Sequence, residues 1–248
     1  FISYRSDINL LEARALYDLL TENGLRKNTF FDKVCLPDGE NWENINLPDG
    51  VEITSVDFNG TNSSILYCTA SGYNDGNKVF KSIDGGLNWK AISLVGKVDF
   101  HFLEGARTDL YGADSQSGDL LYSADSGKTW RSLGANTFSD IAVSPEMPAM
   151  AIALKDSELL LTENAFKTSS KIKSSLKFTQ IEWKKSGLYA LSGNSLYKST
   201  NFGKTWTKQS TFKGAPGILS VSDQMMLVTV GSDIYTSKNS GRKFQILS

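Results

Sequence analysis

The sequence has 248 residues, 26 basic and 27 acidic side chains, a formal charge of −1 and no block of like charges. Nucleic-acid and anionic-membrane surfaces draw their affinity from clustered positive charge, so this balance argues against both partners. No apolar run reaches the roughly 18 residues that span a bilayer. One His, and two Cys without zinc-site spacing, argue against a metal or cofactor site.

The amino-terminal segment, residues 1–28, predicts a strand and then a helix. Apolar side chains recur at helical intervals over residues 10–20, and Gly24 is a typical helix stop. This stretch resembles the opening of bacterial TIR domains, in which a strand like FISYR (1–5) precedes a helix. The resemblance ends after Ile45 and lacks the later helix that bears the catalytic Glu of NAD-cleaving members. We therefore expect the segment to cap the following domain. A remnant of a TIR fusion in signalling or defence is the lesser alternative.

One turn motif then recurs through residues 29–248, which we predict to be a repeat domain. Copies at 82–89 (SIDGGLNW) and 123–130 (SADSGKTW) are near-complete, those at 199–206 (STNFGKTW) and 237–244 (SKNSGRKF) carry Asn for Asp, and those at 35–42 and 162–169 are degenerate. We call these segments box turns. The positions aligned with the box Trp, 42, 89, 130, 169, 206 and 244, of which 169 holds Ser, lie 47, 41, 39, 37 and 38 residues apart. That spacing is one propeller blade per repeat.

The chemistry of the box turn is structural. The Asp or Asn can accept hydrogen bonds from backbone N–H groups two and three residues on, Gly takes a positive φ, and the aromatic ring packs into its neighbour. The motif resembles the Asp-box, or BNR, repeat of sialidases, sortilin-type receptors, some glycoside hydrolases and photosystem assembly factors. The structural box positions are Ser82, Asp84, Gly86, Trp89, Ser123, Asp125, Gly127, Trp130, Ser199, Asn201, Gly203, Trp206, Ser237, Asn239, Gly241 and Phe244.

Three apolar strands divided by polar turns precede each later box turn, which fits antiparallel four-stranded blades. We therefore predict an all-β propeller with one amino-terminal helix. Six box turns favour six blades, with five or seven as alternatives. Residues 29–47 would supply the sixth blade's hairpin. Cys68, in the apolar run 65–68, is expected as a buried thiol, with a disulfide to Cys35 as the alternative.

Any ligand site is expected on the face opposite the box turns. Family resemblance places ligands there, among the second-to-third-strand turns. The candidate ligand-binding residues are Tyr73, Asn74, Asp75, Asp114, Asp156, Asn194 and Asp233.

When the first strands of the repeats are aligned, an acidic residue recurs at one position in four of them. The four residues are Asp57, Asp99, Asp140 and Glu182. We interpret them as acceptors for backbone N–H groups of the next blade, because buried N–H groups need partners. The alternative is a channel lined by carboxylates.

The predicted function is a non-catalytic binding or assembly scaffold, a monomer or part of a larger assembly, that recognises a protein or a carbohydrate. A sialidase would need three clamping Arg, and three of the six Arg, namely Arg14, Arg131 and Arg242, fall outside the expected face. A glycoside hydrolase needs only two nearby carboxylates, so it is the alternative. The compartment stays open, with extracellular or periplasmic slightly favoured.

Overall fold

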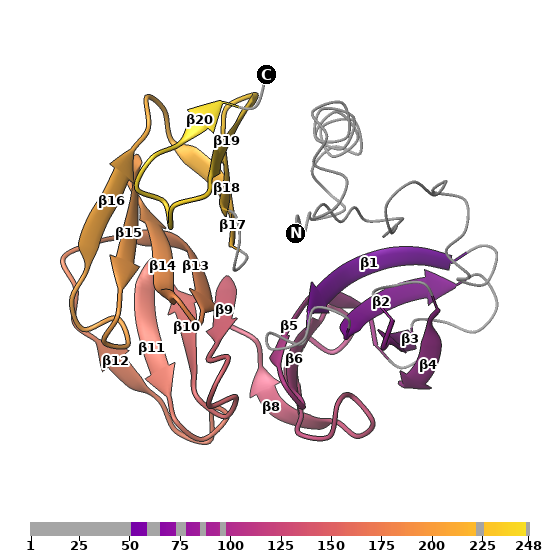
Figure 1. Cartoon of the computed structure of the whole chain (residues 1–248). Coiled ribbons are helices and arrows are strands. Elements are labelled where there is room, and N and C mark those ends of the chain that lie inside the picture. The colour runs from indigo at the N-terminus through magenta and orange to yellow at the C-terminus, as the bar shows by residue number, and fades with distance from the viewer. Residues whose placement is uncertain are drawn as a thin grey trace. The chain divides into compact units, whose positions relative to one another are not determined.

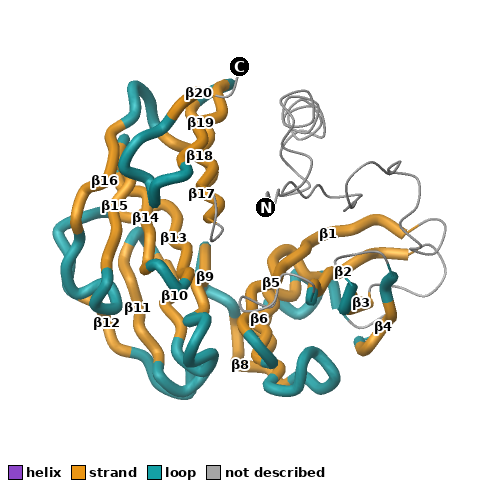
Figure 2. The backbone as a smooth tube through the Cα atoms, viewed as in Figure 1, coloured by secondary structure: helices purple, strands orange, loops and turns teal. Residues whose placement is uncertain are grey.

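The computed structural model describes residues 51–58, 65–72, 78–84, 88–94, 98–221 and 226–246. Twenty strands there form five four-stranded antiparallel sheets, the blades of an all-β propeller, each with its strands in chain order (Figure 1). Within these residues the strands are joined by loops and turns alone, as Figure 2 shows.

The strand bounds are as follows. Blade 1 contains β1 (Val51–Phe58), β2 (Leu66–Gly72), β3 (Lys78–Ser82) and β4 (Lys90–Ser93). Blade 2 contains β5 (Phe100–Ala106), β6 (Asp109–Asp114), β7 (Asp119–Ser123) and β8 (Arg131–Ala135). Blade 3 contains β9 (Asp140–Val143), β10 (Ala151–Lys155), β11 (Glu158–Thr162) and β12 (Ser170–Ile172). Blade 4 contains β13 (Phe178–Lys184), β14 (Gly187–Ser192), β15 (Ser195–Ser199) and β16 (Thr207–Thr211). Blade 5 contains β17 (Pro216–Val221), β18 (Met226–Val230), β19 (Asp233–Ser237) and β20 (Gln245–Ile246).

The blade architecture predicted from the repeats is confirmed, but the described residues hold five blades where six were favoured. The sixth box turn at 35–42, the amino-terminal helix and the TIR-like stretch all lie in residues 1–50, outside the described residues. Cys35 lies there too, whereas Cys68 is fully buried.

The chain divides into two compact units. The first, Phe1–Asn136, holds blades 1 and 2, and the second, Thr137–Ser248, holds blades 3, 4 and 5. In each unit the apolar core lies between consecutive blades. Tyr67 and Val79 of blade 1 pack with Phe100 and Leu110 of blade 2, and similar clusters join blade 3 to blade 4 and blade 4 to blade 5.

The box turn of blade 2 shows how the motif closes its hairpin. The buried Ser123 hydroxyl donates to Asp125 Oδ1 over 2.8 Å and accepts the Gly127 N–H over 2.9 Å. Asp125 accepts the Thr129 N–H at 2.8 Å and the Thr129 hydroxyl at 2.7 Å. The sequence-based expectation holds only in part for the carboxylate, since the Lys128 N–H, three residues on, bonds to it, while its short backbone hydrogen bond comes from Thr129, four residues on. The acceptor of an N–H two residues on is the Ser123 hydroxyl, which accepts the backbone N–H of Asp125.

The box turns of unit 2 keep this geometry with Asn. Asn164, Asn201 and Asn239 each accept the backbone N–H four residues on at 2.9 Å. The amide group of Asn201 donates to the Thr205 hydroxyl over 2.8 Å, where Asp125 accepts from Thr129. Asn is therefore a neutral replacement for Asp at this position.

We expect Asp125→Asn to flatten the acid limb of the stability curve. The Thr129 hydroxyl and then the Thr129 N–H lower the pKa of Asp125 from 3.8 to about 2. A lowered folded-state pKa adds stability that is present above the unfolded pKa and is lost as the pH falls through the folded one. Urea unfolding between pH 3.8 and about 2 should show a smaller loss of stability in Asp125→Asn than in the wild type. Asn201→Asp, the reverse change in unit 2, should steepen the same limb, and equal slopes in all three proteins would contradict this account.

In blade 2 the box aromatic ring joins its turn to the blade before it. The Trp130 indole N–H lies 3.0 Å from the Ser93 hydroxyl of blade 1 and 2.9 Å from the Gly127 carbonyl, and Ser93 donates to the same carbonyl. In blade 4, the corresponding Trp206 indole N–H is buried without a hydrogen-bond partner among the described residues. Ile172 lies beside it and takes the place of Ser93, because each of these two residues pairs with the residue that lies three positions before the box Ser or Thr.

This difference predicts unequal costs for the same substitution. Trp130→Phe removes the indole N–H, whose one hydrogen is shared between two acceptors in a three-centre bond worth about 1 kcal/mol or somewhat more. Trp206→Phe removes a similar apolar area and relieves an unpaired buried N–H group. We expect Trp130→Phe to be the more destabilising change by about 1–2 kcal/mol, measured as the difference in urea unfolding free energy. Equal losses would show that Trp206 has a partner, such as a bound water.

Candidate functional site

The face opposite the box turns is formed by the second-to-third-strand turns. Three of its predicted residues, Tyr73, Asn74 and Asp75, lie outside the described residues. The other four are described, and they fall into two kinds.

Asp114 has a structural role at this face. Its buried carboxylate accepts the Asp99 N–H at 2.7 Å, the Gln116 and Ser117 N–H groups at 3.2 and 3.1 Å, and the Ser117 hydroxyl. Burial raises the pKa of Asp114, but these donors outweigh burial and hold the pKa below its usual range. The carboxylate is therefore committed to the β6–β7 turn and the strand beside it.

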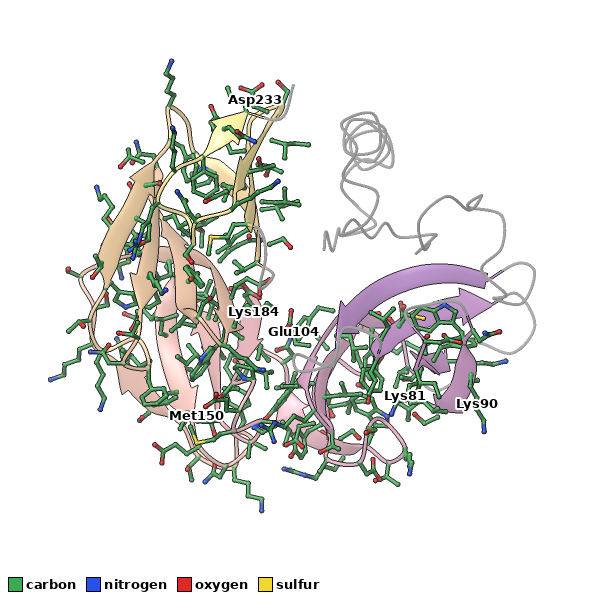
Figure 3. All side chains as sticks on the ribbon, in the orientation of Figure 1. Lys81, Lys90, Glu104, Met150, Lys184 and Asp233 are labelled. Carbon is green, nitrogen blue, oxygen red and sulfur yellow. The ribbon has the colours of Figure 1, made fainter. Side chains whose placement is uncertain are left out.

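Asp156, Asn194 and Asp233 are exposed at the corresponding turns of blades 3, 4 and 5. Asp156 and the following Ser157 both take positive φ, 51° and 63°, as in a tight two-residue hairpin. The Asn194 amide donates to the Phe212 carbonyl at 3.1 Å. Asp233 begins β19 and is labelled in Figure 3. These three residues are the members of the predicted set that present polar atoms to solvent.

The four inner-strand carboxylates do not share one ladder position, so the predicted alignment was wrong. Asp57 pairs with Tyr67, and Glu182 pairs with Tyr189. Each of these two Tyr residues lies one residue after the second-strand residue that pairs with the box Ser. Asp140 pairs with Leu154, three residues past that point. Asp99 precedes β5 altogether.

The residue of blade 2 that matches Asp57 is Glu104, which pairs with Tyr111. Sequence reasoning missed it because the segment VDF at 98–100 matches VDF at 56–58, whereas Glu104 lies in the dissimilar segment LEG at 103–105.

The contacts of these carboxylates are structural where they are described. Asp140 Oδ2 accepts the Ile181 N–H of the next blade, and Oδ1 accepts the Ile141 N–H, both at 2.9 Å. Asp99 accepts the Ser115 hydroxyl at 2.7 Å. Glu182 forms an ion pair of 3.1 Å with Lys184. The predicted acceptance of an N–H from the next blade therefore holds for Asp140.

A hollow of about 240 Å³ lies at the box-turn end of unit 2, where the sequence did not predict a site. Three turns of blades 3 and 4 line it: the β9–β10 turn, the β13–β14 turn and the β15–β16 box turn. Its lining residues are Ser144, Pro145, Glu146, Met147, Trp183, Lys184, Lys185, Ser186, Gly187, Leu188, Ser199, Thr200 and Phe202. We call it the Phe202 hollow. Lys184, at the end of β13, is labelled in Figure 3.

Phe202 is the unusual residue of this hollow. Its side chain is 39% exposed, its ring lies 5.8 Å from that of Trp183, and its φ is 59°. The same box position holds the smaller Ser126, Ala165 and Ser240 in other turns, all with positive φ. A bulky residue with positive φ is a conformational outlier. The sequence does carry a signal of this site, because Phe202 stands at a box position that holds small residues in the other turns.

Metal and membrane features are sparse in the described part of the chain. No group of three or more His, Cys, Asp or Glu side chains is placed there to hold a metal ion. No described helix is long and apolar enough to cross a membrane.

The comparisons with known proteins identify the fold. No family model matches the sequence, and no curated protein matches it. Among solved structures, YCF48 bound to D1 peptide is similar with a TM-score of 0.52 at 15% identity, covering 79% of this chain and 66% of that one. YCF48 from Cyanidioschyzon merolae gives 0.51 at 14% identity, covering 82% and 73%. A nidogen/laminin complex gives 0.58 at 10% identity, covering 79% of each chain. At these identities the likeness shows that the chain has a β-propeller fold, while the Asp-box and TIR resemblances stay predictions.

Proposed function

We propose that this chain is a non-catalytic binding propeller, an assembly scaffold that recognises a protein ligand. The observation that carries the proposal is the engagement of the inner-strand carboxylates. Asp140 holds two backbone N–H groups and Glu182 is paired with Lys184. A glycoside hydrolase needs one carboxylate as acid and a second as base or nucleophile beside the scissile bond. Asp140 instead joins blade 3 to blade 4, and Glu182 is paired with a cation of its own strand.

Propellers of this fold occur in protein complexes, since one similar structure is YCF48 bound to D1 peptide and another is a nidogen/laminin complex. That use of the fold supports a protein ligand ahead of a carbohydrate. We assign the ligand to the face opposite the box turns, at Asp156, Asn194 and Asp233, where exposed polar groups can pair with a partner. We also propose that the box turns make this an Asp-box propeller and that residues 29–47 complete a sixth blade.

The test compares matched baits. Wild-type chain, the double variant Asp156→Asn/Asp233→Asn and the control Glu163→Gln, which changes an exposed carboxylate in a box turn, are immobilised and incubated with an extract of the source cells. We expect defined protein partners to be retained by the wild type and the control and lost from the double variant. A glycan array and a panel of chromogenic glycosides run alongside. Glycan binding without a protein partner, or glycoside turnover abolished by Glu182→Gln, would overturn the proposal.

A further inference from the structure

The Phe202 hollow has the composition of a binding surface. Four large hydrophobic side chains are exposed among the described residues, and two of them, Met147 at 47% and Phe202 at 39%, line this hollow. Half-buried Trp183 forms the ring contact beside Phe202. Aromatic residues and Met are enriched in the cores of protein interfaces, and clustered exposed apolar groups mark such sites.

Phe202 gains little for the fold from its position. A residue in the left-handed region is strained, and the counterparts of Phe202 at Ser126 and Ser240 show that a small polar residue builds the same turn. The exposed ring also leaves apolar area in water. A strained, exposed aromatic residue among small counterparts indicates a role outside folding.

The charge around the hollow selects an acidic partner. Lys184, Lys185 and Glu146 line it, and because Lys184 is paired with Glu182, Lys185 is the cation of the lining to set against Glu146. The exposed basic side chains in the box turns of the same unit are Lys167, Lys204, Lys238, Arg242 and Lys243, and the one acid there is Glu163. Lys204 belongs to the box turn that lines the hollow, and the excess of basic over acidic side chains in these turns gives this end of unit 2 a positive charge that attracts carboxylates.

We propose that the Phe202 hollow binds a linear segment of a partner protein that carries a large apolar side chain next to one or more carboxylates. The apolar side chain packs against Phe202, Met147 and Trp183, while the carboxylates face Lys185 and the neighbouring box-turn cations. This surface lies at the end of the blades opposite to Asp156, Asn194 and Asp233, so it is a second surface, separate from the one assigned above.

A second copy of the chain is the competing occupant. Ile83 is 72% exposed and precedes Asp84, so this chain itself carries an apolar side chain beside a carboxylate. Sedimentation velocity of the full chain separates the two occupants. We expect a monomer at micromolar concentration, and self-association that is lost in both Phe202→Ser and Ile83→Ser would overturn the partner-segment proposal.

The direct test is selection from a phage-displayed library of random dodecapeptides on the full chain. We expect the enriched peptides to place Phe, Leu, Trp or Met beside Asp or Glu. The best peptide should bind Phe202→Ser at least tenfold more weakly than wild type, bind Lys185→Ser severalfold more weakly, and lose affinity as salt is added. Ile83→Ser is the matched control, an equally small change at an exposed apolar box-turn residue of unit 1, and it should bind as wild type does.

Phe202→Ser should keep the fold, because Ser already occupies this position in two box turns, and its melting temperature should equal or exceed that of the wild type. The proposal fails if no peptide is enriched, if enriched peptides lack carboxylates, or if Phe202→Ser binds them as wild type does. These outcomes do not bear on the loop-face proposal, which is tested with Asp156→Asn/Asp233→Asn.

Discussion

Gly241→Ala is expected to cost about 3 kcal/mol of unfolding free energy, the sum of about 1–2 for a left-handed backbone and about 1–3 for overpacking. Gly241 has a φ of 80° in the box turn of blade 5. A Cβ atom there would overlap Leu196 Cδ2 and lie 3.0 Å from Met226 Sδ. Leu196 is fully buried and Met226 nearly so. Since both belong to the core between blades 4 and 5, neither has room to move away.

Gly231→Ala in the same blade is the matched control. Gly231 also has a positive φ, 61°, but a Cβ atom there would meet nothing within 4 Å. It should therefore show only the backbone cost, about 1 kcal/mol. Urea unfolding of the two variants measures the difference. Equal losses would mean that the box-turn Gly is selected for its φ alone and not for close packing.

The repeat made the blades predictable. Box turns at regular spacing, such as 123–130, fixed where each third strand ends and each fourth begins, and the second unit's Asn turns were found from the same pattern. Local hydrogen bonds between residues four apart build each turn, so its sequence specifies its structure without help from distant residues.

Register within the first strand was not predictable in this way. The bulges near Phe100 and Phe178 each shift the ladder, and nothing in the local sequence marks them. A local match of VDF at 98–100 to VDF at 56–58 places Asp99 with Asp57, although Asp99 precedes β5, and the ladder places Asp140 two positions away from the position of Glu182. Contacts between blades depend on this register, which is why partners such as the Ile181 N–H could be named only from the structure.

The Phe202 hollow was missed for a different reason. Its lining comes from two blades, and each turn alone reads as an ordinary loop between strands. The family resemblance places ligands on the face opposite the box turns, so a site was predicted only on that face. The departure of Phe202 from its small counterparts was the one local clue, and its meaning depends on Trp183 and Met147 being beside it.

Asp140→Ala should destabilise unit 2 by about 2–4 kcal/mol, because it leaves two backbone N–H groups without their charged acceptor. Asp140 Oδ2 accepts the Ile181 N–H across the junction of blades 3 and 4, and Oδ1 accepts the Ile141 N–H. Ile141 and Ile181 are both nearly fully buried, so little water is available to replace the carboxylate. Thermal and urea unfolding measure the loss.

Glu182→Ala is the control for that change, because it removes a carboxylate that pairs with Lys184 at 3.1 Å near the surface. Such pairs contribute about 0–1 kcal/mol, so Glu182→Ala should cost well under half as much as Asp140→Ala. Asp140→Asn keeps one acceptor oxygen and should fall between them. A small loss of unfolding free energy in Asp140→Ala would mean that the Asp140 carboxylate is not needed for the fold. It would then be available for chemistry, which would contradict a structural role for the inner-strand carboxylates.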